Sequence, residues 1–308
     1  MSPLASFKLI LDLFFITLFL ALSSLTVQGA TYYVDDDNCP NYGTGMQADP
    51  FCSIQSAIDA GWQNPAEEDK VLVAAGTYGG FEMRIRIEIV GAGQNVSIIQ
   101  GTVYANGVDS TAKLDGFTIT ASGSGSSTGM YIYQAAPVVT NCTFSNHTNT
   151  LGDGGGMRIY DFSAPTIANC RFSNNTARNG GGVYFVGVNA LATFSNCTFD
   201  ENTATYFGGG MYAGGSVTVS NSTFYKNSIL VMNSTSYGGG GIYNYGYLTI
   251  TDSDFFENLA PNGGGIYNLS SGLTVRKSKF TGNSAKYSGG GIYNGAYSAL
   301  TDCLFALN

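Results

Sequence analysis

Residues 255–268 read FFENLAPNGGGIYN, and residues 280–294 read FTGNSAKYSGGGIYN. Each stretch joins a Phe-x-x-Asn step to a run of three glycines and an aliphatic-Tyr pair. The aromatic position recurs every 25 to 31 residues, at Phe144, Phe172, Phe199, Phe224, Phe255, Phe280 and Phe305. A period of this length indicates a solenoid, in which each repeat is one unit stacked on its neighbours.

Each repeat contains a strand with an inner and an outer face. The slot five residues before the Phe is apolar throughout: Val139, Ile167, Phe194, Val219, Ile250, Val275 and Leu300. The slot before that one is threonine in the central repeats: Thr166, Thr193, Thr218, Thr249 and Thr274. Apolar and polar side chains alternate along a strand that is buried on one face, so we expect the apolar slot to form the core.

The slot three residues after each Phe is polar. It holds His147 in the first of these repeats and asparagine in the others: Asn175, Asn202, Asn227, Asn258, Asn283 and Asn308. Asparagine tolerates a left-handed backbone and can hydrogen-bond to the coils above and below, so we expect a structural ladder at a turn. The glycine run would supply a second bend in each coil.

These patterns predict an all-β fold, a right-handed parallel β-helix of about ten coils with three short strands in each. Residues 53–60 carry apolar side chains at helical spacing, and this short helix would cap the first coil. We expect a signal peptide at 1–30, an N-terminal strand and capping helix at 31–68, and the repeats at 69–308. The chain ends on the last residue of a Phe-x-x-Asn step, so we expect either a truncated chain or another cover for the last coil.

The N-terminal residues have the features of a secretory signal. A mainly apolar run from Leu13 to Leu22 is followed by small residues at Gly29 and Ala30. This run is too short to span a bilayer, and we expect no transmembrane segment after it. The net charge is −8 and basic residues are not clustered, which argues against a nucleic-acid partner. The sequence therefore predicts a secreted or cell-surface protein.

Export would place the six cysteines in an oxidising compartment. Cys39 and Cys52 lie outside the repeats, and we predict a disulfide between them. The other four stand two residues before a repeat Phe, at Cys142, Cys170, Cys197 and Cys303. Serine fills this slot in the remaining repeats and cannot replace a thiolate ligand. We therefore predict free thiols in a slot for small side chains, and neither a bound metal nor another cofactor.

The Phe-x-x-Asn step and the Gly-Gly-Gly-aliphatic tetrad resemble the polymorphic outer-membrane protein repeat, in which the tetrad is often Gly-Gly-Ala-aliphatic. The resemblance covers residues 114–308. The N-terminal part, with Tyr32-Tyr33-Val34-Asp35 and Gly76-Thr77-Tyr78, is similar to the start of many pectin-lyase-like β-helix proteins. The resemblance implies a β-helix displayed at the cell outer membrane, often as an adhesin. One fold hosts many activities, so the resemblance does not settle the chemistry.

A glycoside hydrolase needs two carboxylates on either side of one bond. Glu201 and Glu257 occupy equivalent slots two coils apart, but Lys226 fills the slot between them. This order favours a charge ladder on the surface. The acidic run Asp35–Asp37 could hold calcium, although an acidic turn before the capping helix is the simpler interpretation.

A polysaccharide lyase needs a basic group that abstracts a proton. One irregular coil offers low-ranking catalytic candidates, namely Arg158, Asp153, Asp161 and His147, with Arg171 one coil further on. In the structural interpretation of the same coil, Arg158 stacks between Tyr131 and Tyr184.

A column of tyrosines follows the positions of the glycine runs: Tyr131, Tyr184, Tyr212, Tyr243, Tyr267 and Tyr293. Each comes directly after an inward-facing apolar residue, so we expect the column to face outward and to bind a ligand. Exposed aromatic rings at regular spacing can stack on sugar rings or on a partner protein. We therefore predict an exported, adhesin-like protein that binds a glycan, a surface protein or another extended partner without catalysis. The alternative is a carbohydrate-active enzyme of the same fold, most simply a lyase.

Overall fold

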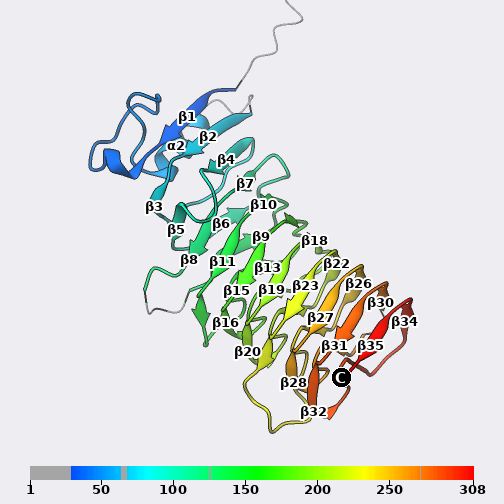
Figure 1. Cartoon of the computed structure of the whole chain (residues 1–308). Helices are drawn as coiled ribbons and strands as arrows, with labels where there is room; N and C mark the ends of the chain where they lie inside the picture. The colour runs from blue at the N-terminus through cyan, green and yellow to red at the C-terminus, as the bar shows by residue number, and fades with distance from the viewer. Residues whose placement is uncertain (1–28, 64–67, 124, 126, 271) are drawn as a thin grey trace, which may run out of the picture.

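The computed structural model describes residues 29–63, 68–123, 125, 127–270 and 272–308. These residues wind into a parallel β-helix whose coils stack along one axis (Figure 1). The predicted signal peptide lies almost wholly outside the described residues. Within them, the only α-helix is α2 (Ile54–Gly61), which is accompanied by a short 3-10 turn, η1 (Asp36–Asn38).

Two long sheets form most of the wall of the rod. The first sheet contains β1 (Thr31–Val34), β2 (Asp69–Val73), β4 (Ile87–Gly91), β7 (Lys113–Asp115), β10 (Val138–Thr140), β14 (Thr166–Ala168), β18 (Leu191–Ser195), β22 (Ser216–Ser220), β26 (Tyr247–Thr251), β30 (Gly272–Arg276) and β34 (Ser298–Thr301). The second sheet contains β3 (Gly76–Gly79), β5 (Ser97–Gln100), β8 (Thr118–Thr120), β11 (Thr143–Ser145), β15 (Arg171–Ser173), β19 (Thr198–Asp200), β23 (Thr223–Tyr225), β27 (Asp254–Phe256), β31 (Lys279–Thr281) and β35 (Leu304–Ala306).

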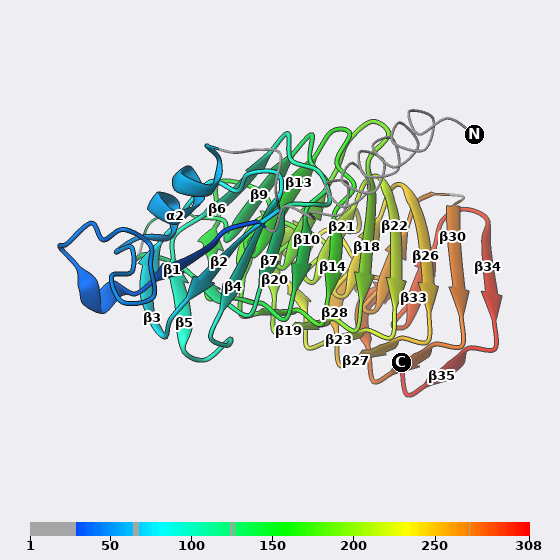
Figure 2. The ribbon, with the colours of Figure 1, turned by 90° about the horizontal axis from the view of Figure 1, so that it is seen from above.

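Two shorter sheets close the coil. The third sheet contains β12 (Thr148–Asn149), β16 (Thr176–Asn179), β20 (Thr203–Phe207), β24 (Ser228–Ile229), β28 (Leu259–Asn262) and β32 (Ser284–Ser288). The fourth sheet contains β6 (Val103–Asn106), β9 (Met130–Tyr133), β13 (Met157–Tyr160), β17 (Val183–Phe185), β21 (Met211–Ala213), β25 (Ile242–Asn244), β29 (Ile266–Asn268) and β33 (Ile292–Asn294). Figure 2 shows that the strands of the first sheet lie side by side and succeed one another along the length of the rod.

The number of complete coils is slightly lower than predicted. Among the described residues, eight coils contribute a strand to the first, second and fourth sheets, whereas the sequence predicts about ten. Additional strands at the two ends extend only the first and second sheets. Six coils also add a short strand to the third sheet, so they contain four strands rather than three.

The predicted apolar slot forms the core. Val219 and Ile250 are fully buried, and the rings of the repeat Phe column stack with centroid separations between 4.4 and 5.0 Å. Leu300, on the last strand of the first sheet, is an exception and is 44% exposed. Parallel strands in register place like residues one above another, so each Phe packs flat against the next (Phe172 on Phe199, for example).

The predicted asparagine ladder is continuous, and all of it is buried except Asn308 at its end, which is exposed. Asn202 Nδ2 donates to Asn227 Oδ1 at 2.9 Å, and Asn227 Nδ2 donates to Asn258 Oδ1 at 2.9 Å. The left-handed residue, however, is the one before each asparagine, as at Lys226 with a φ of 53°. The ladder asparagines are therefore used for hydrogen bonding, and the exposed residue before them makes the turn.

The helix caps the first coil as predicted. Ser53 is its N-cap, and its hydroxyl accepts the backbone N–H of Ser56 at 3.2 Å. Ile54, Ala57 and Ile58 are buried, and the helix packs against β1 and β2. This cap covers apolar side chains at the N-terminal end of the described core.

Candidate functional site

The tyrosine column lies on the outer face of the fourth sheet, where Tyr184, Tyr212, Tyr243, Tyr267 and Tyr293 are in register. Neighbouring rings stand 4.8 to 5.7 Å apart. The expectation of solvent exposure is wrong for the centre of this column, because Tyr243 and Tyr267 are only 6% exposed. The remaining predicted members are half-buried.

Other coils cover the centre of the column. The Phe207 ring lies 4.6 Å from that of Tyr243, measured between centroids. The backbone at Gly238 lies so close to Tyr267 that a Cβ there would come within 2.8 Å of its ring. Burial raises the pKa of the Tyr243 and Tyr267 hydroxyls. The column therefore forms an aromatic layer between coils and leaves little ring surface for a ligand.

Tyr160 completes the column at the irregular coil, and sequence reasoning missed it. Its ring lies 5.8 Å from that of Tyr131 and 6.1 Å from that of Tyr184. Arg158 does not stack between those two tyrosines as expected. Its guanidinium lies over the Tyr160 ring, 4.8 Å from the centroid, and its Nε donates to the Tyr160 hydroxyl. Tyr160 follows Arg158 by two residues, the spacing that places both on one face of a strand, and this signal could have identified it.

Asp153 is buried, and both of its carboxylate oxygens pair with one arginine. Its two carboxylate oxygens accept from Nε and Nη2 of Arg178 at 3.0 and 2.8 Å, and Asn179 Nδ2 adds a third bond at 2.9 Å. The Asp153 carboxylate raises the pKa of Arg178. Asp153 is 4% exposed, and these contacts satisfy its carboxylate inside the fold. Sequence reasoning did not identify Arg178 as its partner.

His147 is a buried member of the asparagine ladder. Its backbone N–H donates to Asn175 Oδ1 at 3.1 Å, and its Nε2 lies 3.1 Å from the carbonyl oxygen of Ile119. Burial lowers the pKa of the imidazole to about 4. A neutral, fully buried imidazole that bonds to a backbone carbonyl is a structural group, out of reach of a polymer substrate.

The two other lyase candidates lie on separate elements. Asp161 stands in the turn after the fourth sheet, where its Oδ1 accepts the backbone N–H of Val188 at 3.3 Å. Arg171 lies on the second sheet and makes a two-pronged ion pair with Asp200, at 2.8 and 2.7 Å. The structure therefore pairs Asp153 with Arg178 and Arg158 with Tyr160, and it places Arg171 on another sheet.

The acidic candidates for hydrolysis and calcium binding lie in turns. Glu201, Lys226 and Glu257 occupy equivalent left-handed positions, with 3.8 Å between Lys226 Nζ and Glu257 Oε2. The carboxylates of Asp35–Asp37 lie within 4.8 Å of one another. Asp35 Oδ1 accepts the N–H of Asp37, and Asp36 Oδ2 accepts that of Thr77 at 2.7 Å. These bonds brace the turn.

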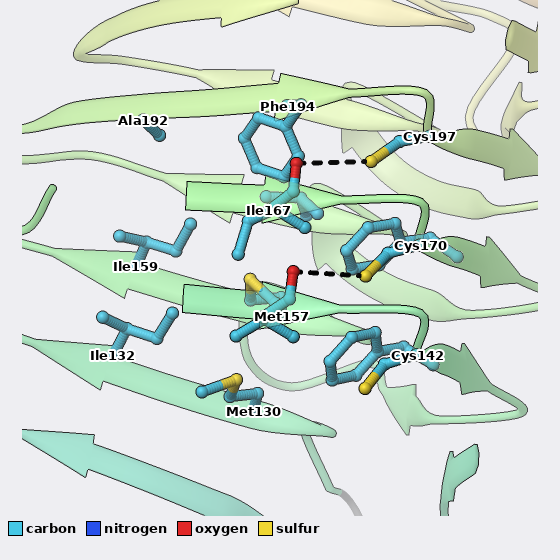
Figure 3. Close-up of a cluster of buried hydrophobic side chains, with 14 of the residues drawn as sticks. Met130, Ile132, Cys142, Met157, Ile159, Ile167, Cys170, Ala192, Phe194 and Cys197 are labelled. Carbon is cyan, nitrogen blue, oxygen red and sulfur yellow. Dashed lines mark hydrogen bonds between the residues drawn. The ribbon is translucent and has the colours of Figure 1, made fainter. Parts of the chain in front are cut away.

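The cysteines fall into two groups. Cys39 and Cys52 form a disulfide in the N-terminal region. Cys142, Cys170 and Cys197 are free and form a buried column (Figure 3). The Sγ atoms of Cys170 and Cys197 donate to carbonyl oxygens of the preceding coil at 3.7 Å. Burial raises the pKa of the Cys197 thiol to about 12, which makes it a poor nucleophile.

Comparison with known proteins supports this architecture. The family model for the right handed beta helix region matches residues 85–245, just over half of the chain. The chain belongs to the right-handed β-helix family. The model for the Chlamydia polymorphic membrane protein repeat matches residues 277–295, which confirms the predicted repeat resemblance. No curated protein matches the chain.

Among the solved structures that are similar to this chain, two examples show how low the similarity is. Pectin methylesterase PemA from Erwinia chrysanthemi is 13% identical, with 89% of this chain and 93% of that chain covered and a TM-score of 0.49. The A-module of mannuronan C-5 epimerase AlgE4 from Azotobacter vinelandii is 14% identical, with 89% and 95% covered and a TM-score of 0.37. Similarities of this size say nothing about the activity of this chain. None of the described helices is both long enough and apolar enough to cross a membrane.

Proposed function

We propose that this protein is an exported, adhesin-like β-helix that binds a glycan or another extended partner without cleaving it. The observation that carries the proposal is the state of the lyase candidates. Asp153 is neutralised by Arg178, His147 is buried against Ile119, and Arg158 rests on Tyr160. Asp153 and His147 bond to residues of neighbouring coils, and Arg158 packs on a tyrosine of its own strand, so each has a structural role that needs no substrate.

The apolar N-terminal residues and the disulfide support export of this protein from the cytoplasm. Residues 1–30 have the composition of a signal peptide, and we propose that the mature protein begins after them. The Cys39–Cys52 disulfide supports an oxidising compartment. The match to the polymorphic membrane protein repeat supports a location at or beyond the cell surface. Residues 31–68 would then form the cap and residues 69–308 the displayed rod.

Regular repetition suits a rod to binding an extended partner. Parallel strands repeat about every 4.8 Å, so one weak contact recurs on each coil and several contacts can add. Because Tyr243 and Tyr267 are covered, the binding surface lies elsewhere than on the centre of the tyrosine column.

Binding and cleavage can be separated in one experiment. Purified protein is incubated with immobilised polysaccharides and with whole cells, and both retention and release of unsaturated sugars are measured, with and without calcium. We expect retention without release, and we expect Arg158→Ala to be retained equally well. Release of unsaturated uronic acids that stops in Arg158→Ala would replace this proposal with the lyase alternative.

A further inference from the structure

A groove lies at the edge between the fourth and the first sheets, where three successive coils turn from one sheet into the other. Its volume is about 450 Å³, and its lining comes from Gly187 and from residues 189–191, 214–216 and 245–247. The strands that follow these turns, β18, β22 and β26, are adjacent in the first sheet (Figure 2). The volume lies in the range of small-ligand sites.

Glycines form much of the floor of the groove. Gly214, Gly215 and Gly246 lie in its lining, and neighbouring coils approach closely here. A Cβ at Gly246 would stand 2.1 Å from the carbonyl oxygen of Gly215, so the turns stack only because that side chain is absent. The backbone of these glycines therefore shapes the groove, because they have no side chains that could fill it.

Two exposed tyrosines line the groove. Tyr245 is 63% exposed and Tyr247 is 71% exposed, unlike the covered rings of the tyrosine column. On the next coil Gly272 pairs with Tyr247, and a Cβ at Gly272 would come within 2.5 Å of its Cδ1 atom. The ring thus occupies the space that a side chain at 272 would fill. Tyr247 leans on the backbone of the next coil while most of its surface stays in solvent.

The lining is uncharged but rich in hydrogen-bonding groups. It contains no Asp, Glu, Lys, Arg or His, and its polar side chains are Asn189, Ser216 and the two tyrosine hydroxyls. Asp161 lies near Gly187 at one end, where its carboxylate accepts a backbone N–H. A polyanion would find no counter-charge in this lining, whereas a neutral sugar needs only an aromatic face and hydrogen-bond partners.

Hydroxyl groups continue beyond the groove across the first sheet. Thr193, Thr218 and Thr249 are exposed and in register on the strands that leave the three lining turns. The row offers one hydroxyl on each coil, so contacts made in the groove can extend along a chain of sugars.

We propose that this groove binds a neutral polysaccharide, with a sugar ring stacked on Tyr247 and its hydroxyls bonded to Ser216 and Asn189. The inference rests on the proposed glycan-binding function and names its site and ligand class. Aromatic stacking supplies most of the affinity, and the uncharged lining selects against polymers of uronic acids.

The test measures binding to soluble β-glucan and xylan as neutral probes and to polygalacturonate as the anionic probe, by affinity electrophoresis and calorimetry. Tyr247→Ala should raise the dissociation constant for a neutral probe about fivefold to tenfold. Gly272→Val, which displaces the ring, should act in the same direction. Tyr42→Ala is the matched control, because Tyr42 is 87% exposed and lies in the N-terminal region. Circular dichroism verifies that each variant is folded.

A folded Tyr247→Ala variant that binds the neutral probes as tightly as wild type would refute the groove as the binding site. It would leave the proposed glycan-binding function intact. Preference for polygalacturonate over both neutral probes would overturn the ligand class. If wild type binds none of the three, the groove inference fails, and retention on whole cells still decides the proposed function separately. Selective weakening by Tyr247→Ala and Gly272→Val, with Tyr42→Ala unchanged, supports the inference.

Discussion

Replacing Asn227 with alanine should cost more stability than a substitution of similar size on the surface. Four hydrogen bonds join the Asn227 side chain to its surroundings. Its Nδ2 donates to the Phe199 carbonyl oxygen at 2.8 Å and to Asn258 Oδ1 at 2.9 Å. Its Oδ1 accepts the backbone N–H of Asn202 at 3.1 Å and Asn202 Nδ2 at 2.9 Å.

The expected cost follows from these contacts. A hydrogen bond contributes about 1 kcal/mol net, and the variant leaves two backbone groups without their side-chain partner in a site that water does not reach. We therefore expect Asn227→Ala to lower the free energy of unfolding by about 3–5 kcal/mol. Urea titration followed by circular dichroism gives this value, and comparison of the slopes with wild type tests whether the transition remains cooperative.

Asn221→Gly provides the control in the same coil. Asn221 is an exposed turn residue with a φ of 48°, a conformation that glycine adopts readily. We expect its effect to stay within about 0.5 kcal/mol. If Asn227→Ala costs no more than this control, the ladder contributes no net stability and our hydrogen-bond argument is refuted.

Three further predictions concern other buried slots. His147 has a pKa of about 4 in the fold against 6.5 when free, so between these values the unfolded chain binds more protons and stability falls as the pH is lowered. The loss should reach roughly 3 kcal/mol by about pH 4, and His147→Asn should remove this slope in unfolding experiments across that pH range. Val219→Asp should prevent folding because it buries an unpaired charge, whereas Thr218→Asp on the exposed face should fold; a folded, equally stable Val219→Asp protein would contradict the assigned inner face. A thiol reagent should label the partly exposed Cys303 first and reach Cys197 only on unfolding, and rapid labelling of Cys197 in the folded state would show that its column opens.

The periodic slots could be read from the sequence because the coils stack in register. In such a stack, position in the repeat decides which residue lies above which, as for Phe199 on Phe224 and Asn202 on Asn227. Alternation within a strand also tells the inner face from the outer one, as for Val219 and Thr218. The apolar core and the asparagine ladder follow from these local rules, and the capping helix follows from the helical spacing of its apolar residues.

The exposure of the outward-facing side chains could not be predicted from the sequence. It depends on contacts between turns of irregular length, and no position in the repeat encodes these contacts. The alternation within the strand predicts that Tyr243 faces outward, but Phe207 from an earlier coil covers its ring. Tyr247 also faces outward, and it remains exposed because the next coil has only Gly272 beside it. The sequence by itself thus determined the solenoid and its core, since these depend on a repeated pattern. Only the tertiary structure decided which outer side chains meet solvent, since that depends on what each neighbouring coil places against them.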